Sequence, residues 1–402
     1  MSVRSDDDWT RESERLLELV DRIADEVVAV HAERVDRDAC FPEESFQALR
    51  GAGLLGVMVP SELGGPGCEL RVVAEMCSTL ARRCASTAMN FAMHQSQVAS
   101  IVDHRGCVPE LDDYLRDLVH EQRLIASVTS EVGVGGDLRR SLAPVELDGD
   151  RITFEKAGTT GSYCQHADDF LVSLRRAPDA AESDQVLVLA RRGEFDLKGV
   201  GDWDTLGMRG TCSPPVTISG AGASWQVLPA PFRVIATRTM VPTSHLLWAA
   251  VWYGIASDAF DRARRFVQVS MRKDADAGCS APTRLAHLAD RLGGMRARIE
   301  MSLGTYERIE ASENAESAVG MAEALELNEL KISASTEALE IVNEAFLVVG
   351  IASYRNGGEF SLGRHLRDIQ SAPLMISNDR IRLSSAELLQ VYKGRGRFAG
   401  PS

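Results

Sequence analysis

The sequence lacks the patterns that several classes of protein need. Its eight cysteines form no CxxC or CxxH pair, which argues against a zinc site or a disulfide framework and favours reduced thiols in a cytoplasmic protein without a metal. The longest apolar run, residues 246–256, is far shorter than the roughly 18–20 residues of a membrane span. The N-terminus is polar and acidic, unlike a signal peptide. We therefore expect a cytoplasmic protein that does not span a membrane.

Basic charge is also scarce. The chain contains 44 Lys and Arg residues but 58 Asp and Glu residues, which gives a net charge of −14. Because a phosphate backbone is bound by clustered basic side chains, and none are clustered here, nucleic acid is excluded as the main partner. What is present is an ordinary globular composition of 402 residues, 45% of them hydrophobic. A chain of this length is expected to form two or three domains.

Helical periodicity dominates residues 1–125. Apolar residues from Leu16 to Val28 recur at spacings of three and four, which places them on one helix face. The same pattern predicts four further helices, over residues 42–52, 70–83, 87–103 and 110–121.

The pattern changes to short β-branched runs between residues 126 and 232. We expect strands near residues 124–130, 151–156, 168–176, 184–192, 215–220 and 224–228. The clusters ELDGD (146–150) and RRGEFD (191–196) are expected to be turns between them. The pattern therefore predicts a central antiparallel β-domain.

Long amphipathic helices return beyond residue 232. An apolar stripe from Leu285 to Leu303 and an Ala-, Glu- and Leu-rich segment over 318–349 favour an antiparallel four-helix bundle. The expected fold class is therefore α+β. It has an N-terminal helical domain (1–125), a central β-domain (126–232) and a C-terminal bundle (233–402).

Four local motifs narrow this plan to one family. They are FPEESFQALRGAGLLGVMVPSELGGPG (41–67), TSEVGVGGD (129–137), TLGMRGTCS (205–213) and LRD (366–368). In this order and over nearly the whole chain they resemble the acyl-CoA dehydrogenase superfamily. One glycine-rich fragment would be weak support, whereas four ordered motifs are specific.

The resemblance implies a flavin, FAD in the usual case, between the β-domain and the bundle. It gives Ser130 and Ser162 the positions of two flavin-contacting threonines, and Thr160 that of a tryptophan that packs on the ring. It implies that Arg272 meets the cofactor pyrophosphate of a neighbouring subunit in a homotetramer or homodimer. Thr129 and Asn378 complete the expected flavin contacts. If the resemblance is set aside, Ser130 and Ser162 are explained as hydroxyls in turns and Arg272 as a solvent-exposed charge.

The chain differs from the family at the positions that carry the family's catalytic and substrate-binding residues. The family places a catalytic glutamate at one of two positions, which here are Ile376 and about Ser244, and residues 205–257 contain no Asp or Glu. Pro242 and His245 replace an Asp–Arg pair that holds CoA, and Gly136 replaces a serine that touches the pantetheine arm. We therefore expect either an acyl group on another carrier, such as an acyl carrier protein, or a substrate that is no thioester.

Three side chains are candidates for acid–base catalysis. Asp379 lies three residues beyond the usual glutamate position, although an ion pair with Arg380 or Arg382 would equally explain it. His94 lies in a helix that passes beside the flavin in this superfamily, and monooxygenases of the fold often carry a histidine there. A buried structural histidine is the alternative. His245, at the start of the bundle, is the third candidate.

Three functions remain open. The preferred one is an acyl-thioester dehydrogenase with a relocated base and a separate electron acceptor, because most chains with this motif order oxidise acyl thioesters. The second is a monooxygenase that uses O2 and reduced flavin (FMN is then possible) from a flavin reductase to hydroxylate an amine or a carbon atom of a small molecule. The third is a catalytically silent homologue with a binding role.

Overall fold

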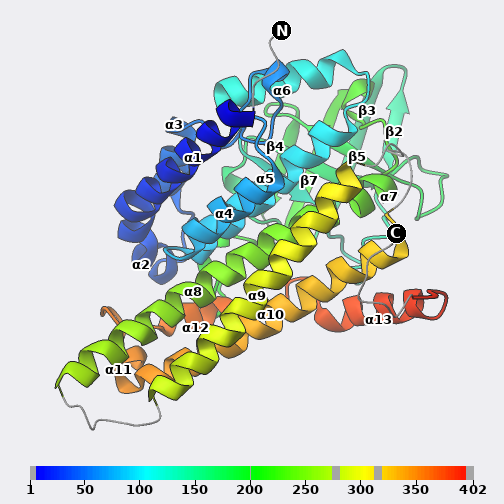
Figure 1. Ribbon diagram of the computed structural model, residues 1–402. Coiled ribbons are helices and arrows are strands. Elements are labelled where there is room, and N and C mark those ends of the chain that lie inside the picture. Colours follow the sequence, from blue (N-terminus) through cyan, green and yellow to red (C-terminus); the bar gives the residue numbers. More distant parts are fainter. Residues whose placement is uncertain (1–5, 200, 274–280, 312–318, 395–402) are drawn as a thin grey trace.

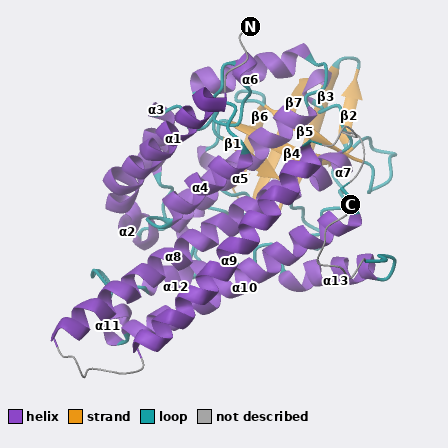
Figure 2. Cartoon of the chain, in the orientation of Figure 1, coloured by secondary structure: helices purple, strands orange, loops and turns teal. Residues whose placement is uncertain are grey.

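The protein consists of an N-terminal and a C-terminal helical region, which pack against each other, and two small β-sheets beside them (Figures 1 and 2). The computed structural model describes residues 6–199, 201–273, 281–311 and 319–394. The order of helical, β and helical regions confirms the fold class expected from the sequence.

The N-terminal region is helical where the apolar periodicity predicts it. Leu16, Val20 and Val28 are buried, as a helix face that packs on a core requires. A π-helical turn over Ala24–Val28 separates the first two helices. The helices are α1 (Asp6–Ile23), α2 (Ala29–Arg37), α3 (Glu43–Gly51), α4 (Leu70–Ala81), α5 (Ala85–His104) and α6 (Pro109–Glu121).

The central region contains a three-stranded and a four-stranded sheet, with strand orders β1-β4-β5 and β2-β3-β7-β6. Burial alternates residue by residue along β3, as expected for a strand with one face on the core. The strands are β1 (Ile125–Val128), β2 (Val145–Asp148), β3 (Arg151–Gly158), β4 (Asp169–Arg175), β5 (Gln185–Ala190), β6 (Phe195–Gly199) and β7 (Val216–Ala223).

The sheets differ from the sequence expectation in three places. β1 pairs with β4 in parallel, because the chain passes through the second sheet before it returns to the first. β2 overlaps the first segment expected to be a turn (146–150), and β6 begins at the end of the second (191–196); both are edge strands, whose polar residues resemble those of turns. Ser224–Gln226 is a 3₁₀ turn instead of a strand, and only Val227 bridges to Val188.

The C-terminal region is built around α8, which packs against α9 and α10 and also against α4 and α5. The described residues contain three long helices here rather than the four of the expected bundle. The helices are α7 (Phe232–Ile235), α8 (Val241–Lys273), α9 (Ala281–Glu310), α10 (Met321–Val349), α11 (Ile351–Tyr354), α12 (Gly363–Ile369) and α13 (Asn378–Leu389). None of the helices in the described ranges is long and apolar enough to cross a bilayer.

Candidate functional site

Two of the predicted flavin contacts, Ser130 and Thr160, meet where β1 and β3 end. Ser130 Oγ accepts a hydrogen bond from the Thr160 backbone N–H (3.2 Å) and donates one to the Thr160 carbonyl oxygen (3.1 Å). The two side-chain oxygens are 3.4 Å apart. Thr160 is exposed and Ser130 half-buried, so both hydroxyls remain accessible to a ligand.

The third predicted contact, Ser162, pairs with a residue that the sequence reasoning missed. Its Oγ lies 2.9 Å from Ser213 Oγ, which is in turn 2.9 Å from Thr211 Oγ1. Ser213 and Thr211 are buried and belong to the TLGMRGTCS motif. Their position inside a recognised motif was the signal that could have identified them. The structure therefore brings neutral hydroxyls together in two small groups, which we call the hydroxyl row: Ser130 with Thr160, and Ser162 with Ser213 and Thr211.

The loop over residues 129–137 is held at its base by buried polar groups. The Glu131 carboxylate accepts hydrogen bonds from Ser141 Oγ (2.7 Å) and from the Ala143 N–H (2.7 Å). Lys156 Nζ lies 3.4 Å from the same carboxylate, and burial lowers the pKa of Lys156 to about 8 although Glu131 opposes that shift. Thr129, a predicted contact, accepts a hydrogen bond from Ser173 Oγ through its carbonyl oxygen.

The LRD motif supports the TLGMRGTCS motif from 160 positions away in the sequence. The Asp368 carboxylate accepts a hydrogen bond from the Met208 N–H at 2.6 Å. Burial raises the pKa of Asp368 to about 6, although Arg364 and the Met208 N–H oppose that shift. Gly207 packs on the backbone of Arg367 so closely that a Cβ atom would overlap it.

His94 lies at the junction of the N-terminal helices and the sheets. Its Nδ1 accepts a hydrogen bond from the Ile125 N–H (3.0 Å), so its Nε2 carries the proton that is donated to the Leu55 carbonyl oxygen (2.8 Å). Burial lowers the pKa of His94 to about 4. Both ring nitrogens are occupied by backbone groups and the ring is neutral, which is the arrangement of a structural histidine and leaves no nitrogen for a substrate.

The two candidates at the start of α8 belong to a buried polar seam between helices. Ser244 Oγ and Thr243 Oγ1 lie 3.4 Å and 3.2 Å from Ser96 Oγ of α5. His245 Nδ1 lies 3.1 Å from the Leu327 carbonyl oxygen, and burial lowers its pKa to about 4. One turn further along α8, the indole N–H of Trp248 is buried and has no hydrogen-bond partner among the described residues.

The remaining predicted residues lie elsewhere. The Asp379 side chain is 91% exposed and pairs with Arg382 at 2.9 Å, so it points into solvent. Asn378 is buried and bonded to Lys331 and Ser335 instead of facing the hydroxyl row. Arg272 is exposed in the last turn of α8, at the end of the molecule that is far from the sheets (Figure 1).

Gly136 has a left-handed backbone (φ +78°), and a Cβ atom there would overlap the guanidinium of Arg380. Arg380 reaches across from α13 and donates a hydrogen bond to the Gly135 carbonyl oxygen. The start of α13 therefore lies directly against the loop that carries Ser130.

The residues of this arrangement fit a flavin. A flavin ring presents carbonyl oxygens and nitrogens along one edge, and neutral hydroxyls suit such groups as donors and acceptors. The buried indole N–H groups of Trp248 and Trp252 are further donors that the described residues leave unpaired. No cluster of three metal-ligating side chains occurs in the described ranges.

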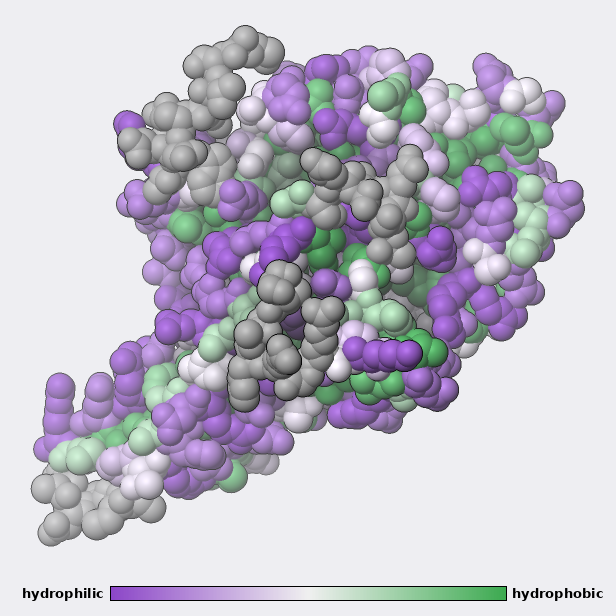
Figure 3. Space-filling model, turned by 45° about the vertical axis from the view of Figure 1, so that its right-hand side comes forward, coloured by the Kyte–Doolittle hydropathy of each residue, from purple (hydrophilic) through white to green (hydrophobic). Residues whose placement is uncertain are grey.

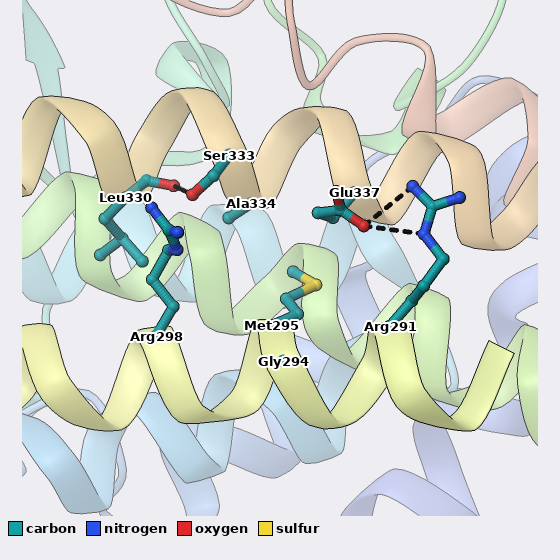
Figure 4. A pocket seen from close by; sticks show the side chains of 8 residues that line it. All are labelled: Arg291, Gly294, Met295, Arg298, Leu330, Ser333, Ala334 and Glu337. Atoms are coloured by element: carbon teal, nitrogen blue, oxygen red, sulfur yellow. Dashed lines mark hydrogen bonds and ion pairs between the residues drawn. The ribbon is translucent and has the colours of Figure 1, made fainter. Parts of the chain in front are cut away.

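One cavity of the described residues lies away from this arrangement. It has a volume of about 290 Å³ and lies between α9 and α10, where Arg291 pairs with Glu337 and Met295 forms the floor (Figure 4). None of the predicted site residues lines it.

Comparison with protein families agrees with the motifs. The N-terminal domain of acyl-CoA dehydrogenase matches residues 10–121, and its C-terminal domain matches residues 246–378. Together these segments make up more than half of the chain, which therefore belongs to the acyl-CoA dehydrogenase superfamily.

Three proteins are similar to the chain over nearly its full length. The amino sugar nitrososynthase DnmZ of Streptomyces peucetius is 25% identical over 90% of this chain and 89% of its own. The probable FMNH2-dependent monooxygenase SfnC of Pseudomonas putida is 23% identical over 89% of this chain and 90% of its own. The crystal structure of FMN-bound TdsC from Paenibacillus sp. A11-2 has a TM-score of 0.81 at 20% identity, and covers 93% of this chain and 97% of that one.

Proposed function

We propose that the chain is a flavin-dependent monooxygenase that uses reduced FMN and O2 to oxidise a small molecule, with an amine nitrogen as the favoured target. Two of the similar proteins are a nitrososynthase and a probable FMNH2-dependent monooxygenase, and both match the whole architecture instead of one domain. These likenesses favour a monooxygenase over the acyl-thioester dehydrogenase that the motif order alone favours.

One structural observation carries the proposal: among the described residues, neither of the two positions where the family keeps its base holds a carboxylate, and the buried carboxylates of Glu131 and Asp368 are bonded to backbone N–H groups. Dehydrogenation of an acyl thioester needs a base to remove the α-proton. Asp379, the acid nearest the expected position, faces solvent and is paired with Arg382. The expected positions themselves hold Ile376 and Ser244. Oxygenation does not need a carboxylate there.

The residues of the site have separate roles in this proposal. Ser130, Thr160 and Ser162 bind the polar edge of the flavin, and Ser213 orients the Ser162 hydroxyl. The bound reduced flavin supplies the two electrons with which one oxygen atom of O2 goes to the substrate and the other becomes water.

The other side of the site is formed by helices. Trp248 and Trp252 of α8 are buried, and their indole N–H groups, unpaired among the described residues, are available as donors to a ligand that enters between the helices. The hydroxyls of Ser96 and Ser244 place neutral polar groups near the substrate, which suits a small polar metabolite.

Isotope incorporation tests the proposed function. The purified protein is supplied with FMN, NADH, a flavin reductase and ¹⁸O2, and is offered amino sugar nucleotides in one series and acyl-CoA thioesters in another. We expect one ¹⁸O atom in an oxidised amine, detected by mass spectrometry, and no product when the protein is omitted. Anaerobic bleaching of a protein-bound flavin by an acyl thioester would instead establish the dehydrogenase, and absence of flavin binding would establish the silent homologue.

Asp379→Asn provides the matched control variant. Because this side chain faces solvent, we expect kcat/KM within about twofold of the unmodified protein. A loss of a hundredfold or more would identify Asp379 as a base and contradict the proposal.

A further inference from the structure

Lys331 is a buried cation whose hydrogen bonds all go to one turn. It lies in the middle of α10 with no exposed surface. Its Nζ donates to the carbonyl oxygens of Ala372 (3.1 Å) and Ile376 (2.6 Å) and to Asn378 Oδ1 (2.8 Å). No carboxylate is within ion-pair distance of Lys331 in the described part of the chain. Its three N–H groups are therefore all used to fix the segment between α12 and α13.

The turn that Lys331 binds has a strained backbone. Ile376 has a φ of +49°, in the left-handed region. A β-branched side chain is rarely found there because its Cβ crowds the backbone, and such strain persists only when surrounding contacts impose it. The carbonyl group of Ile376 itself receives the shortest of the three Lys331 bonds. The hydrogen bond from Lys331 thus holds Ile376 in a left-handed backbone conformation from which it would otherwise relax.

The turn around Ile376 fixes the position of the first residue of α13. Asn378, the first residue of α13, is bonded to Lys331 and donates through Nδ2 to Ser335 Oγ at 3.0 Å. Two residues later, Arg380 donates to the Gly135 carbonyl oxygen in the loop that carries Ser130. A second contact, between Arg139 and Glu387 at 3.6 Å, joins α13 to the residues that directly follow this loop. A continuous set of bonds therefore leads from Lys331 to the 129–137 loop.

Gly136 lies beside this contact between α13 and the loop. Its backbone is left-handed (φ +78°), a conformation that glycine adopts without strain. The Arg380 guanidinium occupies the space next to it, so α13 and the loop are in direct contact at this point.

We propose that Lys331 is a positioning residue for flavin binding: it fixes the left-handed turn at Ile376, and through α13 and Arg380 it holds the 129–137 loop in the shape that binds the flavin. The inference rests on the proposed function. Burial lowers the pKa of Lys331 to about 8, with Arg382 adding to that shift, so at neutral pH the amine keeps its proton and all three donors.

The first test removes the cation while keeping an unbranched apolar chain. In Lys331→Met we expect the Kd for FMN to rise at least tenfold. Fluorescence titration with FMN under reducing and oxidising conditions measures this Kd. Lys198→Met, an exposed lysine on β6, is the matched control and should bind FMN as the unmodified protein does. Unchanged affinity in Lys331→Met would overturn the inference.

The second test asks whether Lys331 acts through the strained turn. Glycine adopts the left-handed region without strain, so Ile376→Gly should make Lys331 less necessary. We expect the double variant Lys331→Met/Ile376→Gly to recover FMN affinity to within about threefold of Ile376→Gly alone. Equal losses with and without Ile376→Gly would show that Lys331 serves only general stability.

The third test needs no flavin, so it separates this inference from the proposed function. Hydrogen exchange of the 129–137 loop should become at least several-fold faster in Lys331→Met, while exchange in α6 stays unchanged. Arg380→Met, a surface substitution that leaves the core intact, should produce the same acceleration. Faster loop exchange without FMN binding in the unmodified protein would refute the proposed function alone; an unchanged loop would refute the role of Lys331.

Discussion

At the scale of single residues, the histidines show how burial decides a role. His94, His104 and His245 are buried, and burial lowers the pKa of each to about 4. The folded protein keeps these imidazoles neutral, whereas the unfolded chain can bind a proton at each of them. Acid therefore favours the unfolded state. Below the ordinary histidine pKa of about 6.5 the unfolded state gains that proton first, so folding becomes less favourable.

We therefore expect acid to destabilise the protein through His94. The contribution of neutral His94 to the free energy of unfolding is fully present above about pH 6.5 and is lost as the pH falls toward 4. Between pH 7.5 and pH 5 this lowers the free energy of unfolding by roughly 2 kcal/mol. Urea unfolding at these two pH values measures it. His94→Gln should show a smaller loss of unfolding free energy on acidification, whereas His120→Gln, an exposed histidine of α6, should behave as the unmodified protein. An identical pH dependence in His94→Gln would contradict this assignment.

At the scale of elements, motifs that are far apart in sequence meet as neighbours. The LRD motif forms much of α12, and its Asp368 binds the backbone of Met208 just before the hydroxyls of Thr211 and Ser213. The value of the motif is therefore structural: it fixes the end of the β-domain against the C-terminal region.

Removal of the Asp368 carboxylate tests this contact. Asp368→Ala leaves the Met208 N–H buried without an acceptor, which should lower the unfolding free energy by about 2–3 kcal/mol. Asp368→Asn keeps an oxygen acceptor and should lose less than half as much. Denaturant unfolding of both variants gives the comparison, and equal losses would show that charge and not the hydrogen bond matters.

The sequence predicted the elements better than the site. Apolar periodicity located α3, α4, α5 and α10 to within a few residues, because their buried faces are continuous. Edge strands β2 and β6 were missed because exposed polar residues look like turns.

Site residues are harder to predict where one residue type has two possible environments. His94 on an apolar face is compatible with catalysis or structure, and its two backbone bonds favour structure. Lys331 was not singled out from the sequence, although it lies on the same helix face as Leu327 and Ala334, and a lysine on an apolar face is a usable signal.

At the scale of the whole molecule, large hydrophobic side chains remain exposed on the C-terminal region, and Figure 3 shows such side chains among hydrophilic ones. Leu383, Leu389 and Val391, on α13 and just beyond it, are each about 60% exposed in the single chain. Surface of this kind marks an interaction site. The superfamily resemblance implies a homotetramer or homodimer, and this face is suited to such an interface.

We expect the protein to self-associate through α13. Leu383→Glu combined with Leu389→Glu should shift the molar mass toward the 43.7 kDa of one chain, because burying two carboxylates in an apolar interface is unfavourable. Light scattering coupled to gel filtration measures the mass. Val30→Glu, an equally exposed apolar position on α2, serves as the control. A monomeric unmodified protein would contradict the expectation.

Helix α5 has side-chain bonds to the N-terminal, central and C-terminal regions of the fold. Asn90 donates to the Gly210 carbonyl oxygen, His94 links Leu55 to Ile125, and Ser96 meets the start of α8. A swivel of one region against another would have to break several of these buried bonds at once. Opening and closing by rotation of whole domains is thus disfavoured, and reactants must enter and leave through local rearrangement of loops and side chains.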